Sequence, residues 1–102
     1  MNDDLTDHVV RTAERMESFD DPYDAIEELQ PLDVTAEVSL SSDGYRNVTL
    51  TVATGGPHIE INVSRGTVSG YWSSDSHTTH FNNETVADGL HDYYVRQFQQ
   101  LR

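Results

Sequence analysis

Residues 54–80 read TGGPHIEINVSRGTVSGYWSSDSHTTH and contain the pattern that decides the fold. In HIEINV, Ile59, Ile61 and Val63 alternate with polar residues, which is the period of a strand with one buried and one wet face. The SRG triplet at residues 64–66 predicts a turn into a second strand, TVSGYWS, and TGGP predicts a turn before the first. The stretch therefore predicts two antiparallel strands joined by a tight turn.

The same two-residue period precedes this stretch. Apolar and polar residues alternate from residue 34, and SSDG at residues 41–44 predicts a hairpin turn into another alternating run. The inward positions of these two strands are Val34, Ala36, Val38 and Leu40, then Val48, Leu50 and Val52. HTTHF at residues 77–81 is either a fifth short strand or a loop.

Apolar residues at spacings of three and four predict helices at both ends of the chain. The first helix has the stripe Leu5, Val9, Thr12, Met16 and Phe19. A short second helix begins at Pro22 behind an Asp21 cap and stops at Pro31. Asn82 or Asn83 caps the last helix, whose stripe is Ala87, Leu90, Tyr94, Phe98 and Leu101.

These elements predict a single α+β domain over residues 1–102. Two N-terminal helices precede an antiparallel β-meander of four or five strands, a long C-terminal helix follows, and the helices cover one face of the sheet. The other face of the sheet is expected to be exposed to solvent. It is expected to display Thr35, Glu37, Ser39, Asn47, Thr49, Thr51, His58, Glu60, Asn62, Ser69 and Tyr71.

The charge balance is strongly acidic. The chain has 18 Asp and Glu against 6 basic residues, all of them arginine, for a formal net charge of -12. Most of the excess lies in residues 1–37, which hold twelve carboxylates and only Arg11 and Arg15. Acid excess without lysine resembles the cytoplasmic proteins of extreme halophiles, especially haloarchaea, in which molar salt screens the repulsion. A locally acidic interaction surface is the alternative reading.

Composition excludes several classes of function. The chain contains no cysteine, which removes disulfides, thiol nucleophiles and thiolate metal sites. No apolar run is long enough to cross a bilayer, and the N-terminus MNDDLTDH is acidic where a secretory signal is basic. We therefore expect a soluble cytoplasmic protein with no membrane association. Direct nucleic-acid binding is not expected because no basic patch is present.

Four residues are weak candidates for a metal site. His58 and Glu60, two apart on a strand, point the same way, and imidazole with carboxylate suits zinc. His77 and His80 add ligands only if their segment is a loop, because residues three apart on a strand face opposite sides. This spacing is typical of surface histidines, and we expect no bound metal or other cofactor.

Catalytic residues are not identified. SSDSHTTH contains Ser, His and Asp, but the chain lacks a GxSxG nucleophile elbow, and local proximity does not make a triad. TGGP is followed by a strand instead of a helix N-terminus, so it does not predict a phosphate loop. The sequence leaves enzymatic function open without favouring it.

The predicted strand at residues 67–73 is the candidate partner-binding segment. It carries no lysine, proline or charge, the features that normally protect a sheet edge from pairing with another chain. Val68 and Trp72 share a face, so Trp72 is expected in the core and Tyr71 outside. The sequence therefore predicts self-association or partner binding through Ser69 and the exposed member of the Tyr71 and Trp72 pair.

Residues 54–100 also resemble small uncharacterised proteins of microbial genomes and mobile elements, in which a GGP turn, a strand and a YW-containing strand precede a final helix. The resemblance implies the same local fold and an accessory function, and it transfers no site residue. The sequence favours a small non-catalytic protein-interaction or regulatory domain. The alternatives are an acidic nucleic-acid mimic built on the two N-terminal helices, and a His/Glu metal-binding protein.

Overall fold

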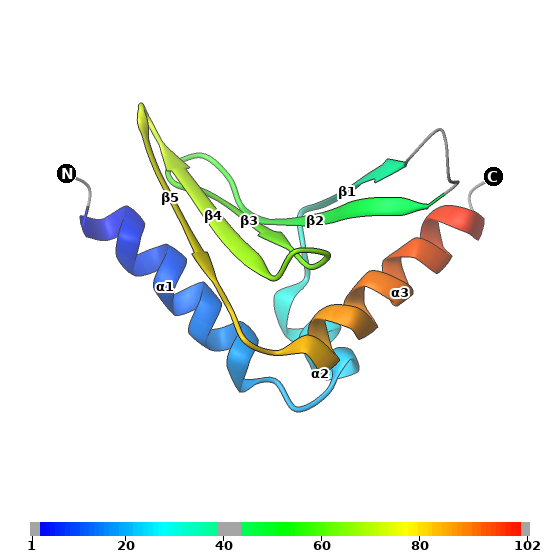
Figure 1. Ribbon diagram of the computed structural model, residues 1–102. Coiled ribbons are helices and arrows are strands. Elements are labelled where there is room, and N and C mark those ends of the chain that lie inside the picture. The colour runs from blue at the N-terminus through cyan, green and yellow to red at the C-terminus, as the bar shows by residue number, and fades with distance from the viewer. Residues whose placement is uncertain (1–2, 39–43, 101–102) are drawn as a thin grey trace.

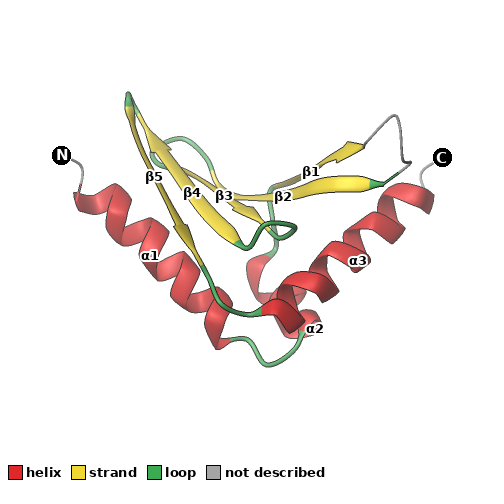
Figure 2. Cartoon of the chain, viewed as in Figure 1, coloured by secondary structure: helices red, strands yellow, loops and turns green. Residues whose placement is uncertain are grey.

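A computed structural model describes residues 3–38 and 44–100, and its described part has an α+β architecture (Figures 1 and 2). The helices are α1 (Asp3–Ser18), α2 (Pro22–Leu29) and α3 (Glu84–Gln100). The strands are β1 (Asp33–Val38), β2 (Tyr45–Ala53), β3 (His58–Asn62), β4 (Thr67–Trp72) and β5 (Asp75–His80). The predicted fold class is confirmed.

The five strands form one antiparallel sheet in the order β1-β2-β3-β4-β5. The HTTHF segment is mostly strand: β5 pairs with β4 along its whole length, from Asp75 opposite Trp72 to His80 opposite Thr67. The prediction that residues 67–73 form an edge is therefore wrong. β4 lies inside the sheet, and β5 forms the edge in its place.

The helices cover one face of the sheet, as predicted (Figure 1). Helix α1 packs on β4 and β5, α3 contacts β2, and α2 packs against α3. The largest fully buried side chains include Leu5 and Met16 of α1, Leu50 and Ile61 of the sheet, and Leu90 of α3. One core thus joins both ends of the chain to the same sheet face.

Gly70 allows α1 to approach the sheet closely. A Cβ atom at this position would lie 2.5 Å from Cγ2 of Val9 and 2.8 Å from Cδ1 of Leu5. Both contacts are shorter than van der Waals separation, so a larger residue requires α1 to move. The missing side chain in β4 therefore sets the position of α1 over β4 and β5.

Asn83 connects the two ends of the helical layer. Its Oδ1 accepts from the N–H of Val86, which makes it the predicted cap of α3. Its Nδ2 donates to the carbonyls of Met16 and Phe19 at 2.9 Å each, where α1 ends. One side chain thus begins α3 and satisfies two carbonyl groups near the end of α1.

Asp21 caps α2 as predicted, accepting from the N–H groups of Tyr23 and Asp24. Ser39, Leu40 and residues 41–43 of the predicted SSDG turn lie outside the described residues, as does Leu101. Within the described ranges, no helix is both long and apolar enough to cross a membrane.

Candidate functional site

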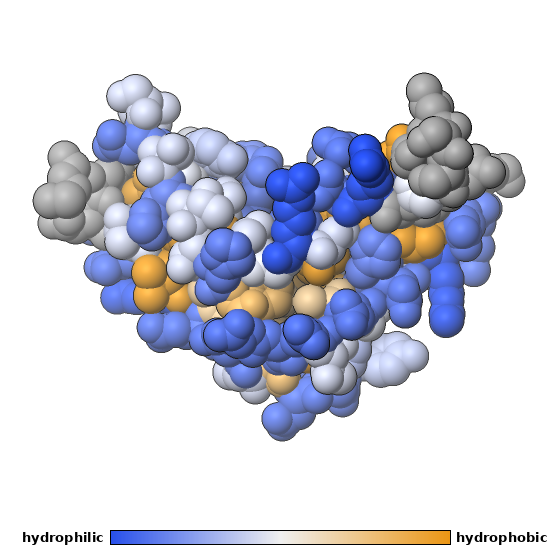
Figure 3. Space-filling view, in the orientation of Figure 1, coloured by the Kyte–Doolittle hydropathy of each residue, from blue (hydrophilic) through white to orange (hydrophobic). Residues whose placement is uncertain are grey.

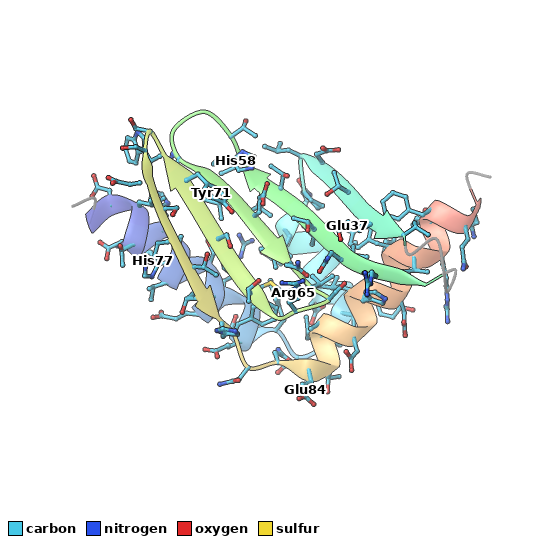
Figure 4. The ribbon with its side chains drawn as sticks, turned by 45° about the horizontal axis from the view of Figure 1, so that its top comes forward. Glu37, His58, Arg65, Tyr71, His77 and Glu84 are labelled. Atoms are coloured by element: carbon cyan, nitrogen blue, oxygen red, sulfur yellow. The ribbon has the colours of Figure 1, made fainter. Side chains whose placement is uncertain are left out.

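The sheet face opposite the helices is polar, as predicted, with one exception (Figure 4). Thr51 was expected to be displayed on this face but is only 8 % exposed. Val38 was expected to point inward and is 40 % exposed, beyond the register irregularity of β1.

Side chains of the polar face are hydrogen-bonded across strands. Nδ2 of Asn47 on β2 donates to Glu37 on β1 at 2.7 Å. Oδ1 of Asn47 accepts from Nδ2 of Asn62 at 3.2 Å and from Nε of Arg65 at 3.0 Å. This ladder ties three strands and the β3–β4 turn together, so much of the hydrogen-bonding capacity of the face is used within the protein.

His58 and Glu60 form a side-chain pair on the same face. Nε2 of His58 lies 2.8 Å from Oε1 of Glu60, and both side chains are about one-third exposed. Tyr71 lies opposite His58 on β4, with ring centroids 6.1 Å apart. Of the four metal candidates, these two are the ones that the fold brings into contact.

The other two metal candidates lie elsewhere. His77 is paired with Gly70, and directly opposite residues of an antiparallel pair share a face, so His77 is on the helix side of the sheet (Figure 4). His80 is paired with Thr67, at the opposite end of β4 from Tyr71. Over the described ranges, no group of three or more His, Cys, Asp or Glu side chains could hold a metal ion.

The partner-binding candidates on β4 have mixed positions. Ser69 is half-buried in an inner strand, and its hydroxyl lies 2.9 Å from that of Thr78 on β5. Tyr71 is 45 % exposed, as predicted. Trp72 was predicted in the core and is 36 % exposed, because it ends β4 and packs beside Gly56 in the β2–β3 turn.

The outer side of β5 is the feature that the sequence prediction missed. Within the described part, no strand pairs with this side, so alternate backbone N–H and C=O groups of β5 point away from the sheet. Residues 76–80 contain no Asp, Glu, Lys, Arg or Pro, and the β4–β5 register is regular. The sequence HTTHF is compatible with an edge strand, but it is equally compatible with a loop.

An acidic stripe of α1 runs along this edge. Asp7, Val10, Glu14 and Glu17 recur at spacings of three and four and are exposed, so they form one stripe of the helix. Glu17 accepts from the N–H of Asn82, two residues after β5, at 2.8 Å. On the other flank of α1, Arg15 donates to the carbonyl of Glu28 in α2. These two contacts orient the helix, and the stripe lies on its β5 side.

Among the described residues, the carboxylates of this stripe take part in no ion pair. Across the described ranges, the only ion pairs are Arg15 with Glu28, at 3.4 Å, and His58 with Glu60. Asp7 and Glu14 are therefore available to an external cation. We refer to the outer side of β5 together with Asp7, Val10, Glu14 and Glu17 as the β5 edge site.

A serine–histidine contact occurs on the other side of the molecule. Oγ of Ser64 lies 2.8 Å from Nδ1 of His91 and also accepts from the N–H of Val48. This hydroxyl takes the place of a ladder carbonyl at the end of β3 and connects α3 to the sheet. Because both contacts fix Ser64 in place, the arrangement explains the docking of α3 without requiring catalysis.

Comparisons with known proteins assign no family. No family model matches the chain, and no curated protein or solved structure is significantly similar to it. The function is therefore inferred from the geometry of the β5 edge site.

Proposed function

We propose that this protein is a non-catalytic interaction domain that binds an extended, basic segment of a partner protein at the β5 edge site. The partner segment adds to the sheet as a sixth strand. The observation that carries the proposal is the outer side of β5, with which no strand of the described residues pairs, together with the neighbouring acidic stripe of α1.

The backbone of β5 provides affinity for any extended segment, whatever its side chains. An added strand forms main-chain hydrogen bonds with the outward N–H and C=O groups of an edge, and its alternate side chains contact the surfaces on either side. Natural edges are protected from this pairing by charge, proline or a bulge. Asp75, at the first position, is the one charged residue of β5, so the rest of the strand lacks these protections.

The stripe of α1 selects the chemistry of the partner. Side chains of an added strand face α1 about every 6.8 Å. Asp7 and Glu14 are seven residues apart, or about 10.5 Å along the helix axis. This spacing is larger than that of the strand side chains, but flexible Lys and Arg side chains can reach across the difference between the two spacings. Val10 lies between them and is 37 % exposed, so it offers an apolar contact to the stems of those side chains.

The wider acidity of the chain fits a cytoplasm rich in salt, which we propose as its setting. Exposed carboxylates on α1 and α2 outnumber the arginines there, and screening at molar salt relieves their repulsion. An acidic nucleic-acid mimic would use the same carboxylates but not the backbone of β5. The two functions therefore differ in whether the ligand must be able to form a strand.

A peptide-binding measurement tests the proposal. A fluorescein-labelled peptide in which lysine alternates with threonine is titrated with the protein and followed by anisotropy. A second peptide of equal charge has prolines in place of the threonines, so it cannot pair with an edge. We expect the first peptide to bind at least about tenfold more tightly, since a single edge hydrogen bond contributes about 1 kcal/mol and several are lost.

Matched variants locate the site. At about 0.1 M salt, where exposed ion pairs are only partly screened, Asp7→Asn with Glu14→Gln should weaken binding about fivefold, for two pairs of about 0.5 kcal/mol each. Glu27→Gln on α2 removes an exposed carboxylate away from the stripe and should leave binding unchanged. Equal affinity for the two peptides would favour the mimic. A dimer in sedimentation whose formation blocks the peptide would show that a second copy of this chain, and not a basic partner, occupies the edge.

A further inference from the structure

A second concave site lies between the β3–β4 turn, the β5–α3 loop and the first two turns of α3. It is a cleft with a volume of about 500 Å³. The buried side chains of Val63, Phe81 and Ala87 form part of its lining. Figure 3 shows apolar atoms in the middle of the molecule between two hydrophilic rims. This volume is within the range of small-molecule sites, about 300–1,000 Å³.

The two rims of the cleft carry opposite charges. Arg65 belongs to the β3–β4 turn, whereas Glu84 and Asp88 lie on α3 (Figure 4). Glu84 and Asp88 are four residues apart, so their carboxylates share one face of the helix. Among the described residues, Arg65 forms no ion pair with either of them. The opposite charges therefore line one cleft without neutralising each other.

The polar groups in the cleft differ in how many hydrogen bonds they already form within the protein. Ser64 and Asn83 are held by contacts within the protein. Arg65 uses Nε to bind Asn47, which fixes the direction of the guanidinium and leaves its terminal amino groups for a ligand. The cleft therefore has one positioned cation and two carboxylates to offer.

From this arrangement we infer that the cleft binds a small zwitterionic solute of the amino-acid type. Its carboxylate pairs with Arg65, and its ammonium group lies between Glu84 and Asp88. The aliphatic part of the solute covers the apolar floor. A guanidinium binds a carboxylate through parallel N–H donors, whereas an ammonium group suits carboxylates as a point charge. The charged groups of this site lie on the β3–β4 turn and α3, so its variants remove no residue of the acidic stripe on α1, although His80 at the end of β5 and Asn82 also line the cleft.

Amide NMR titration tests the inference. The probes are L-alanine, 4-aminobutyrate and 6-aminohexanoate, which are zwitterions with increasing distance between their charges. Butylamine and butyrate each carry one of the two charges. We expect at least one zwitterion to give saturable shifts confined to residues 63–66 and 80–88, and to bind about tenfold more tightly than either singly charged probe.

Three variants decide whether both rims take part. Arg65→Gln, and separately Glu84→Gln with Asp88→Asn, should each weaken zwitterion binding about tenfold. Asp92→Asn, one turn further along α3 and outside the cleft lining, should leave it unchanged. Butylamine binding as well as the zwitterion, with no effect of Arg65→Gln, would overturn the inference in favour of a simple cation site. Absence of saturable shifts with all three zwitterions would also overturn it.

Discussion

The two edges of the sheet differ in how well they are protected. β1 follows Pro31, carries Asp33 and Glu37, and has a register irregularity between Glu37 and Val38. These are the devices by which natural sheets avoid pairing with other chains. β5 has a regular register and a single acidic residue at its first position. Although both strands end the same sheet, only β5 presents a nearly uncharged backbone edge.

The surroundings of the edges strengthen this difference. β5 is bordered by α1, whose exposed stripe includes three carboxylates. On the open face of β1, Glu37 instead accepts a hydrogen bond from Asn47 of the neighbouring strand. The comparison indicates two arrangements of acidic groups: the carboxylate of Glu37 is hydrogen-bonded within the sheet at β1, whereas those of Asp7 and Glu14 beside β5 form no ion pair among the described residues.

The largest effect is expected from removing the cover of β5. Gly70→Val places side-chain atoms where Val9 and Leu5 of α1 now lie, and overpacking of this kind costs about 3 kcal/mol. Urea unfolding measures the loss. Ala36→Val in half-buried β1 is the matched control and should change stability by less than about 1 kcal/mol. Similar losses in both variants would mean that the contact of α1 with β4 is no tighter than the packing around Ala36 in β1.

Removal of salt should act on the same side of the molecule with a smaller effect. Like charges three or four residues apart on α1 repel by about 0.2–0.5 kcal/mol per pair when unscreened, which sums to about 1 kcal/mol. Amide exchange in molar and in low salt should show α1 and α2 losing protection before β2 and β3 do. Unchanged protection at low salt would count against the halophilic setting.

Alkaline pH should give a small effect on the side of α3. Burial, together with neighbouring Tyr93, raises the pKa of Tyr94 above its ordinary value of 10.0. The unfolded chain then loses this proton first, so stability is full below pH 10 and falls as pH rises through the folded pKa. Tyr94→Phe should therefore reduce the fall in the free energy of unfolding between pH 9 and 11, as measured by urea unfolding. If the fall in stability with pH were unchanged in this variant, it would come from groups other than Tyr94.

Much of the fold could be predicted because periodicity records burial directly. Ile59 and Ile61 alternate with polar residues in a half-buried strand, and the Asp21–Pro22 pair is a local helix start. The β5 strand was ambiguous because Thr and His fit a strand or a loop, and its identity depends on pairing with β4. That ambiguity also placed the expected edge one strand too far inward.

Trp72 and the candidate sites show why side-chain environments were harder to predict. The alternation of side chains along a strand predicted Trp72 on the core face. Because Trp72 is the last residue of β4, it packs beside Gly56 instead. The alternation of side chains predicted that His77 and His80 would face opposite sides if their segment were a strand, and their positions in β5 agree with this. The acidic stripe was visible as a helical spacing, but its position beside β5 depends on tertiary contacts such as that of Glu17 with Asn82.

The most direct test of the central claim is amide hydrogen exchange with and without the lysine–threonine peptide at saturation. Binding at the β5 edge site predicts slower exchange at alternate amides of residues 75–80, where the added strand accepts their hydrogen bonds, and no change in residues 33–38. Slower exchange in β1, or peptide binding that leaves every β5 amide unchanged, would contradict the account.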